Sequence, residues 1–171
     1  MTEKVLPVDS VLANPEKYVD REIEVSGRCV HICSGTGNKL FIVGSNDTSL
    51  LWCDATPYIG GRFPRELLDK TLVLKGILRE ERVSETNISI IEQRHEAKVN
   101  TISAEKGAEA AQNADCTAGR CRTDRRVHGQ ENIDNIHDRM ADYRRRIAER
   151  VATDSIPYLS FYYLDVARIN P

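Results

Sequence analysis

Three residues that could bind a metal ion alternate near the end of the first long apolar segment. Cys29, His31 and Cys33 occupy every second position there. Because successive side chains of a β-strand point to opposite faces, the three would share one face unless a bulge intervenes. Gly27 stands where a bulge or a sharp bend could fall, which leaves the facing of the three side chains open. Two thiols and an imidazole side by side are typical of part of a ligand site.

Two later cysteines could complete such a site. Thiolate and imidazole are the usual ligands of zinc and of iron–sulfur clusters. We therefore predict a metal site made by His31, Cys33, Cys116 and Cys121. The alternative is that Cys29 and Cys33 are small buried hydrophobic residues, and that Cys116 and Cys121 are free or disulfide-linked thiols. The chain has five cysteines, so a complete intramolecular disulfide framework is excluded.

The remaining cysteine and histidines have simpler interpretations. Cys53 lies inside a predicted strand, and we expect it in the core. His95 falls on the apolar stripe of a predicted helix, so we expect a half-buried histidine or one whose hydrogen bonds are satisfied. It is the alternative metal ligand if Cys121 does not bind the metal. His128 and His137 are predicted to be surface residues.

Strands must position the candidate ligands. Strands are predicted at about 21–33, 40–43, 49–54 and 71–79, with a last one at about 158–169. Short polar turns join the first three, which indicates an antiparallel meander. Gly27 and Gly76 interrupt two of the strands, as strongly curved barrel strands require. The last strand is apolar enough to be buried, and we expect it to pair with an open edge and close a barrel.

Helices are predicted between the fourth and the last strand. From near Ser84 the apolar residues recur at spacings of three and four, and a second helix is predicted at about 131–151. This helical insertion covers about 85–152 of a single domain spanning 1–171, since the chain is short for two domains. The predicted fold class is mainly β with an α insertion, a five-stranded barrel plus two helices.

Five strands in this order, with an insertion before the last, resemble the OB-fold. The run at 13–27, Ala-Asn-Pro-Glu-Lys-Tyr-Val-Asp-Arg-Glu-Ile-Glu-Val-Ser-Gly, is similar to the opening of a group of small bacterial OB-fold proteins, often exported or of lipoprotein type. The resemblance implies that the first strand ends in a His-x-Cys pair, here His31 and Cys33. It also implies a further cysteine, here Cys116 or Cys121, before a helix and the last strand.

An alternative function is binding of single-stranded nucleic acid or of a protein partner, with the cysteines incidental. OB-folds commonly bind single strands through a basic groove and stacked aromatic rings. The candidates for such a surface are Phe41, Trp52, Tyr58, Arg120, Arg122, Arg125 and Arg126, with Arg144 to Arg146 beyond them. Acidic residues are interleaved with the arginines, so a solvated, salt-bridged face is the default interpretation and nucleic acid is not favoured.

An enzyme would use Cys33 as a nucleophile and His31 as its base. No oxyanion-hole motif, third orienting residue, phosphate-binding glycine loop or haem-attachment motif accompanies this pair. We therefore expect a non-catalytic binding protein. Its expected partner is a metal ion, and a protein partner or a second copy of the chain stays open.

The composition limits the class of protein and its location. The net charge of -2 argues against a chain whose main task is to grip phosphate backbones. No apolar run is long enough to span a bilayer. The start, Met-Thr-Glu-Lys-Val-Leu-Pro, lacks the regions of a signal peptide, which predicts a cytoplasmic protein. The alternative is a periplasmic protein whose N-terminal leader has been cut off and replaced by Met1, because its sequence would start in the same way.

Overall fold

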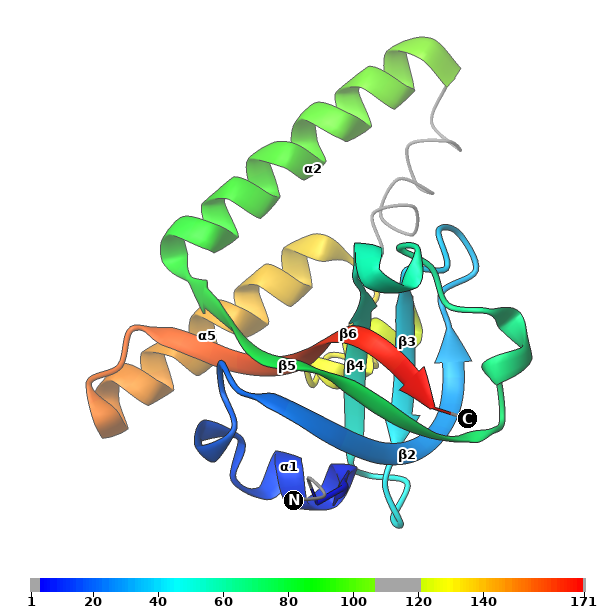
Figure 1. The fold of residues 1–171 in the computed structure, drawn as a ribbon. Helices are drawn as coiled ribbons and strands as arrows, with labels where there is room; N and C mark the ends of the chain where they lie inside the picture. Colours follow the sequence, from blue (N-terminus) through cyan, green and yellow to red (C-terminus); the bar gives the residue numbers. More distant parts are fainter. Residues whose placement is uncertain (1–3, 107–120, 171) are drawn as a thin grey trace. The chain divides into compact units, whose positions relative to one another are not determined.

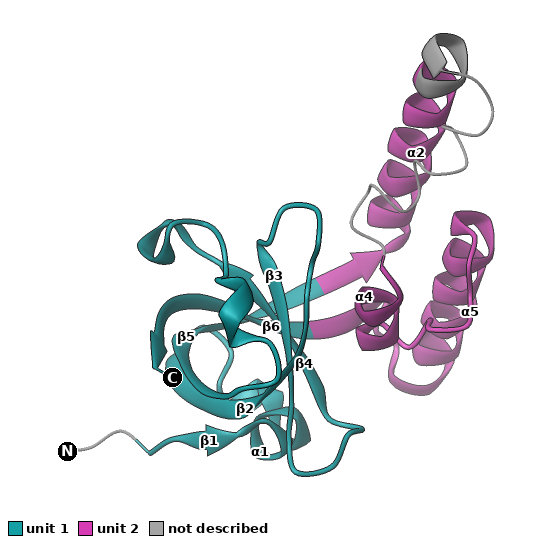
Figure 2. Cartoon of the chain, turned by 90° about the vertical axis from the view of Figure 1, so that its right-hand side faces the viewer, with its two compact units in different colours: residues 1–81, 162–171 teal, residues 82–161 magenta. Residues whose placement is uncertain are grey.

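The structure is a computed structural model that describes residues 4–106 and 121–170 (Figure 1). The chain divides into two compact units (Figure 2). The barrel unit comprises residues 1–81 and 162–171, and the helical unit comprises residues 82–161. The helical unit contains the stretch in which the sequence predicts an insertion.

The barrel unit is formed by strands that the sequence predicts in the same order. They are β2 (Glu22–Ile32), β3 (Lys39–Val43), β4 (Leu50–Ala55), β5 (Thr71–Ser84) and β6 (Tyr158–Asn170). Neighbours follow the order β2-β3-β4-β6-β5, and pairing of β2 with β5 closes the barrel. Strands β4 and β6 are parallel, whereas β2–β3, β3–β4 and β2–β5 are antiparallel. The prediction of a five-stranded OB-fold-like barrel is confirmed.

A short N-terminal segment extends the barrel. Strand β1 (Leu6–Pro7) pairs in parallel with β2, and helix α1 (Val8–Ala13) follows it directly. Val8 and Val11 of α1 are fully buried in the barrel core. Three 3₁₀ turns complete the unit at Pro15–Lys17, Pro57–Ile59 and Arg65–Leu67.

Alternate residues of the strands point into the barrel and form its core. On β5 these are Leu72, Leu74 and Leu78. Gly76 belongs to the same inward row, and a Cβ at this position would clash with the backbone of Asp165 on β6. The glycine therefore allows β5 and β6 to approach each other closely.

The helical unit contains α2 (Glu85–Lys106), α4 (Arg122–Val127) and α5 (Ile136–Asp154). The sequence predicts α2 and α5 but not the short α4. Helix α5 begins later than predicted because Asn135 caps it, accepting a hydrogen bond of 2.8 Å from the backbone N–H of Asp138. Among the described residues no helix has the length and apolar character needed to cross a membrane.

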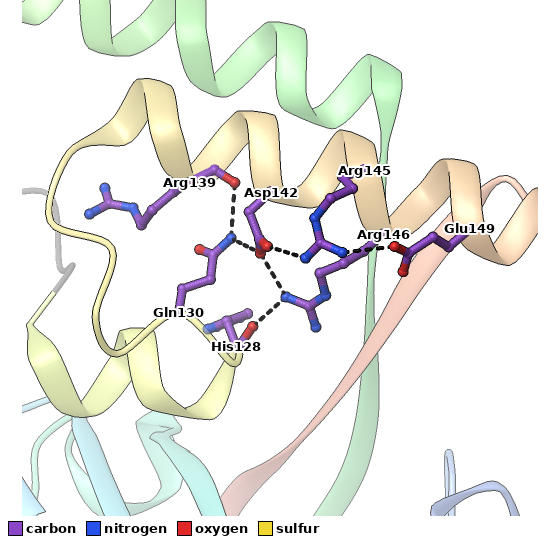
Figure 3. Close-up of polar contacts among 7 residues, drawn as sticks. All are labelled: His128, Gln130, Arg139, Asp142, Arg145, Arg146 and Glu149. Carbon is purple, nitrogen blue, oxygen red and sulfur yellow. Dashed lines mark hydrogen bonds and ion pairs between the residues drawn. The ribbon is translucent and has the colours of Figure 1, made fainter.

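A buried polar network holds the segment before α5 against that helix (Figure 3). The Nε2 of Gln130 donates to the backbone oxygen of Arg139 at 2.9 Å and to Asp142 Oδ2 at 3.0 Å. Arg146 Nη1 donates to the backbone oxygen of His128 at 2.8 Å. The prediction that His128 is a surface residue is wrong, since only 3% of it is exposed.

Candidate functional site

A bulge near the end of β2 separates the three alternating residues of the first strand. Cys29 pairs with Ile42 of β3, whereas His31 pairs with Phe41, so the register shifts between Cys29 and His31. Cys29 consequently points into the barrel core and is fully buried, while His31 and Cys33 are half-buried on the outer face. The sequence suggested a bulge at Gly27, but the bulge lies further along the strand, between Cys29 and His31. His31 and Cys33 therefore form a pair that excludes Cys29.

The surroundings of His31 favour the neutral form of its imidazole. Its ring lies against Phe41, with ring centroids 5.6 Å apart. Burial lowers the pKa of His31, and the positive charge of Arg65 lowers it further. Since a metal binds the neutral form of imidazole, this environment keeps His31 in the form that a ligand requires.

The backbone around Cys33 is fixed by hydrogen bonds in the turn between β2 and β3. The N–H of Cys33 donates to the oxygen of Lys39 at 2.9 Å, and the N–H of Gly37 donates to the oxygen of Cys33 at 3.1 Å. The guanidinium of Arg65 donates to the oxygens of Cys33 and Ser34 at 3.3 and 3.0 Å. Among the described cysteines, the half-buried thiol of Cys33 has no disulfide partner. A tightly held backbone thus carries this thiol two residues along the chain from His31.

Cys29 and Cys53 are core residues. Both are fully buried in the barrel. Burial raises the pKa of Cys29 to about 11 and that of Cys53 well above its usual value. Because the thiolate is the form that binds metals, these two thiols are poor ligands in the folded protein. The prediction that Cys53 lies in the core is confirmed.

The other two predicted ligands come later in the chain, after α2. Cys116 lies outside the described residues. Cys121 belongs to the helical unit and precedes α4, where its Sγ accepts a hydrogen bond of 3.5 Å from the backbone N–H of Asp124. Among the side chains that the structure describes, those of residues 4–101 and 121–170, no three His, Cys, Asp or Glu are arranged to hold a metal ion. The four-residue site stays a prediction.

The aromatic candidates for nucleic-acid binding are mostly covered. Phe41 and Trp52 are partners across β3 and β4, and they are 0% and 3% exposed. Trp52 stacks on Tyr163 with ring centroids 4.5 Å apart, and its Nε1 donates to Asp54 at 2.8 Å. A base needs an exposed ring to stack on, and of these candidates only Tyr58, 86% exposed, offers one.

The arginine candidates near α4 form ion pairs. Arg122 contacts Glu131 at 3.3 Å, and Arg125 contacts Asp134 at 2.9 Å. Arg126 is exposed, and Arg120 lies outside the described residues. These contacts agree with a salt-bridged face, the default interpretation of the basic cluster.

The two remaining histidines come together in the helical unit. His95 of α2 is half-buried, as expected, and His137 of α5 is exposed, as predicted for a surface residue. Their ring centroids are 6.4 Å apart, and both line a cavity of about 320 Å³. The sequence analysis does not pair them, because 41 intervening positions hide the contact. Local spacing could indicate only that Glu92 and His95, three apart on α2, lie on one face of that helix.

The closed mixed barrel and the helical segment between β5 and β6 define the class, an OB-fold-like barrel protein with a helical insertion. Comparison of the chain with protein-family models, curated proteins and solved structures finds no match. The resemblance to the small bacterial OB-fold proteins therefore stays a prediction.

Proposed function

We propose that this chain is a non-catalytic metal-binding protein in which His31 and Cys33 supply two ligands to a zinc ion or an iron–sulfur cluster. The observation that carries the proposal is the bulge in β2, after which His31 and Cys33 are half-buried whereas Cys29 is in the core. Imidazole and thiolate together suit zinc and iron–sulfur centres better than the hard cations magnesium and calcium.

The surroundings of the pair also support metal binding. The hydrogen bonds around Cys33 hold its backbone, which reduces the freedom lost when a ligand site forms. We propose Cys116 and Cys121 as the source of further ligands, as the sequence predicts. A cytoplasmic location is part of the proposal, because a reducing compartment keeps Cys33 available as a thiol.

The test is elemental analysis with an absorption spectrum on protein purified without oxygen or chelator. We expect near-stoichiometric zinc or iron in the unmodified chain and its loss in a His31→Ala, Cys33→Ser double variant. Visible thiolate-to-iron bands would select a cluster over zinc. Single Cys116→Ser and Cys121→Ser variants report which cysteine contributes to binding.

Cys53→Ala is the matched control, because it removes a thiol from the barrel core rather than from the proposed site. It should keep the metal content of the unmodified chain. A chain that contains no metal and takes none up, or a double variant that retains the full amount, contradicts the proposal.

A further inference from the structure

The cavity of the helical unit has a polar wall made of ligand-type side chains. It lies between α2 and α5 and has a volume of about 320 Å³. Val99 and Ile136 contribute apolar surface, and Glu92, His95 and His137 bring two imidazoles and a carboxylate to the same space. Two histidines and one carboxylate are a ligand set of zinc and of other first-row divalent metals.

The two imidazoles are nearly close enough to share one ion. Their ring centroids are 6.4 Å apart and the rings are perpendicular. Since zinc binds imidazole nitrogen at about 2.0–2.1 Å, two rings on one ion have centres about 5–6 Å apart. Among the described residues, no three His, Cys, Asp or Glu side chains are placed to hold a metal ion as they stand, so a side chain must move for a site to form. His137 is exposed at the start of α5, so its side chain is free to change rotamer. Such a rotation can bring its ring close enough to that of His95 for both to bind one ion.

Glu92 is oriented and kept ionised by a neighbouring arginine. Arg144 Nη2 donates to Glu92 Oε1 at 2.6 Å, and Arg144 Nη1 donates to Oε2 at 3.0 Å. The hydrogen bonds from Arg144 lower the pKa of Glu92, and the nearby His137 lowers it further. Each carboxylate oxygen retains a lone pair for a metal, and ligating carboxylates are commonly held by such outer hydrogen bonds.

We propose that His95, His137 and Glu92 form a second metal site, which takes a divalent transition-metal cation of the zinc class. Water completes the coordination, because the cavity is open and larger than one ion needs. Arg144 is a positioning residue that holds the Glu92 carboxylate toward the cavity. The site consists of residues of α2 and α5 alone, so it is independent of the pair at His31 and Cys33.

The test uses Co²⁺, whose visible bands report its ligands, on the full chain carrying His31→Ala and Cys33→Ser. We expect one bound equivalent, with d–d bands and no thiolate-to-cobalt band, and competition by Zn²⁺. Adding His137→Ala should weaken Co²⁺ binding at least tenfold. Because His137 is exposed, misfolding of the variant would not explain such a loss. His95→Gln should have a similar effect. Glu149→Gln, which removes an exposed carboxylate elsewhere on α5, should leave binding unchanged.

The proposal is overturned if the chain carrying His31→Ala and Cys33→Ser binds no Co²⁺. It is also overturned if adding His137→Ala to that chain leaves the affinity for Co²⁺ unchanged. The two sites can fail separately. A thiolate-to-cobalt band in the unmodified chain that disappears with Cys33→Ser reports the barrel pair alone. The d–d bands that remain, and that disappear with His137→Ala, report the site between α2 and α5 alone.

Discussion

At the scale of single residues, the bulge in β2 decides which side chains can meet a ligand. A strict alternation would put Cys29 with His31 and Cys33, and the barrel would then lose an apolar core residue at position 29. The shifted register instead keeps Cys29 and Ile32 inside and leaves His31 and Cys33 outside. The backbone irregularity thus separates a structural thiol from a chemically available one.

The lowered pKa of His31 makes stability depend on pH. Burial, aided by the charge of Arg65, disfavours the protonated ring, so the unfolded chain binds this proton more tightly than the folded chain. The free energy of unfolding should therefore decrease as the pH falls through 6.5, the ordinary histidine value, toward the lower folded pKa. Urea unfolding of metal-free protein between about pH 7.5 and 5.5 measures this decrease.

His31→Gln provides the comparison, because it retains a polar side chain that does not titrate. Its free energy of unfolding should fall less steeply over the same pH range than that of the unmodified chain. Equal slopes in the two proteins would contradict the assignment of the effect to His31.

At the scale of elements, Arg144 links the two long helices of the helical unit. From α5 it donates to Glu85 at 2.9–3.1 Å and to Glu92 at 2.6 and 3.0 Å, both on α2. Forked arginine–carboxylate contacts are stronger than single contacts, although solvent screens this partly exposed group. Arg144→Met should lower the free energy of unfolding by about 1 kcal/mol. It should also increase hydrogen exchange in the first turns of α2.

Arg145→Met is the matched control for Arg144. Arg145 is adjacent on α5 and also contacts two acidic residues, Asp142 and Glu149, but neither lies on α2. Hydrogen exchange in α2 should therefore be unchanged in this variant. An equal increase in both variants would show that Arg144 does not hold the helices together specifically.

The elements that the sequence predicts are those with a strong local pattern. Strands β2 to β6 show apolar runs bounded by turn residues, and α5 shows a clear helical pattern, whereas α2 shows helical spacing only at a few apolar positions. Helix α4 spans only Arg122–Val127 and has no such pattern. The bulge after Cys29 depends on pairing with β3, and the meeting of His95 with His137 depends on packing of α2 on α5. Neither is encoded by neighbouring residues, which is why the candidate site was predictable only in part.

At the scale of the whole molecule, the barrel depends on strands from both ends of the chain. β6 pairs with β4 and β5, and β2 pairs with β5, so the sheet closes only when the C-terminal strand is in place. Because these pairings join residues far apart in sequence, closure must overcome a large loss of chain entropy. Close backbone approach between β5 and β6 is therefore a condition for the fold as a whole.

Gly76 provides a direct test of that condition. In Gly76→Ala the new Cβ would clash with the backbone oxygen of Asp165 and lie 3.1 Å from the Cα of Val166. Since backbone atoms cannot rotate away as a side chain does, the strands must separate, and denaturant unfolding should show a loss of about 3 kcal/mol or more. Gly35→Ala is the control, because a Cβ there meets nothing within 4 Å. It should change stability by less than about 0.5 kcal/mol. If Gly76→Ala is as stable as Gly35→Ala, β5 and β6 do not pack this closely, and the closed barrel is wrong at this edge.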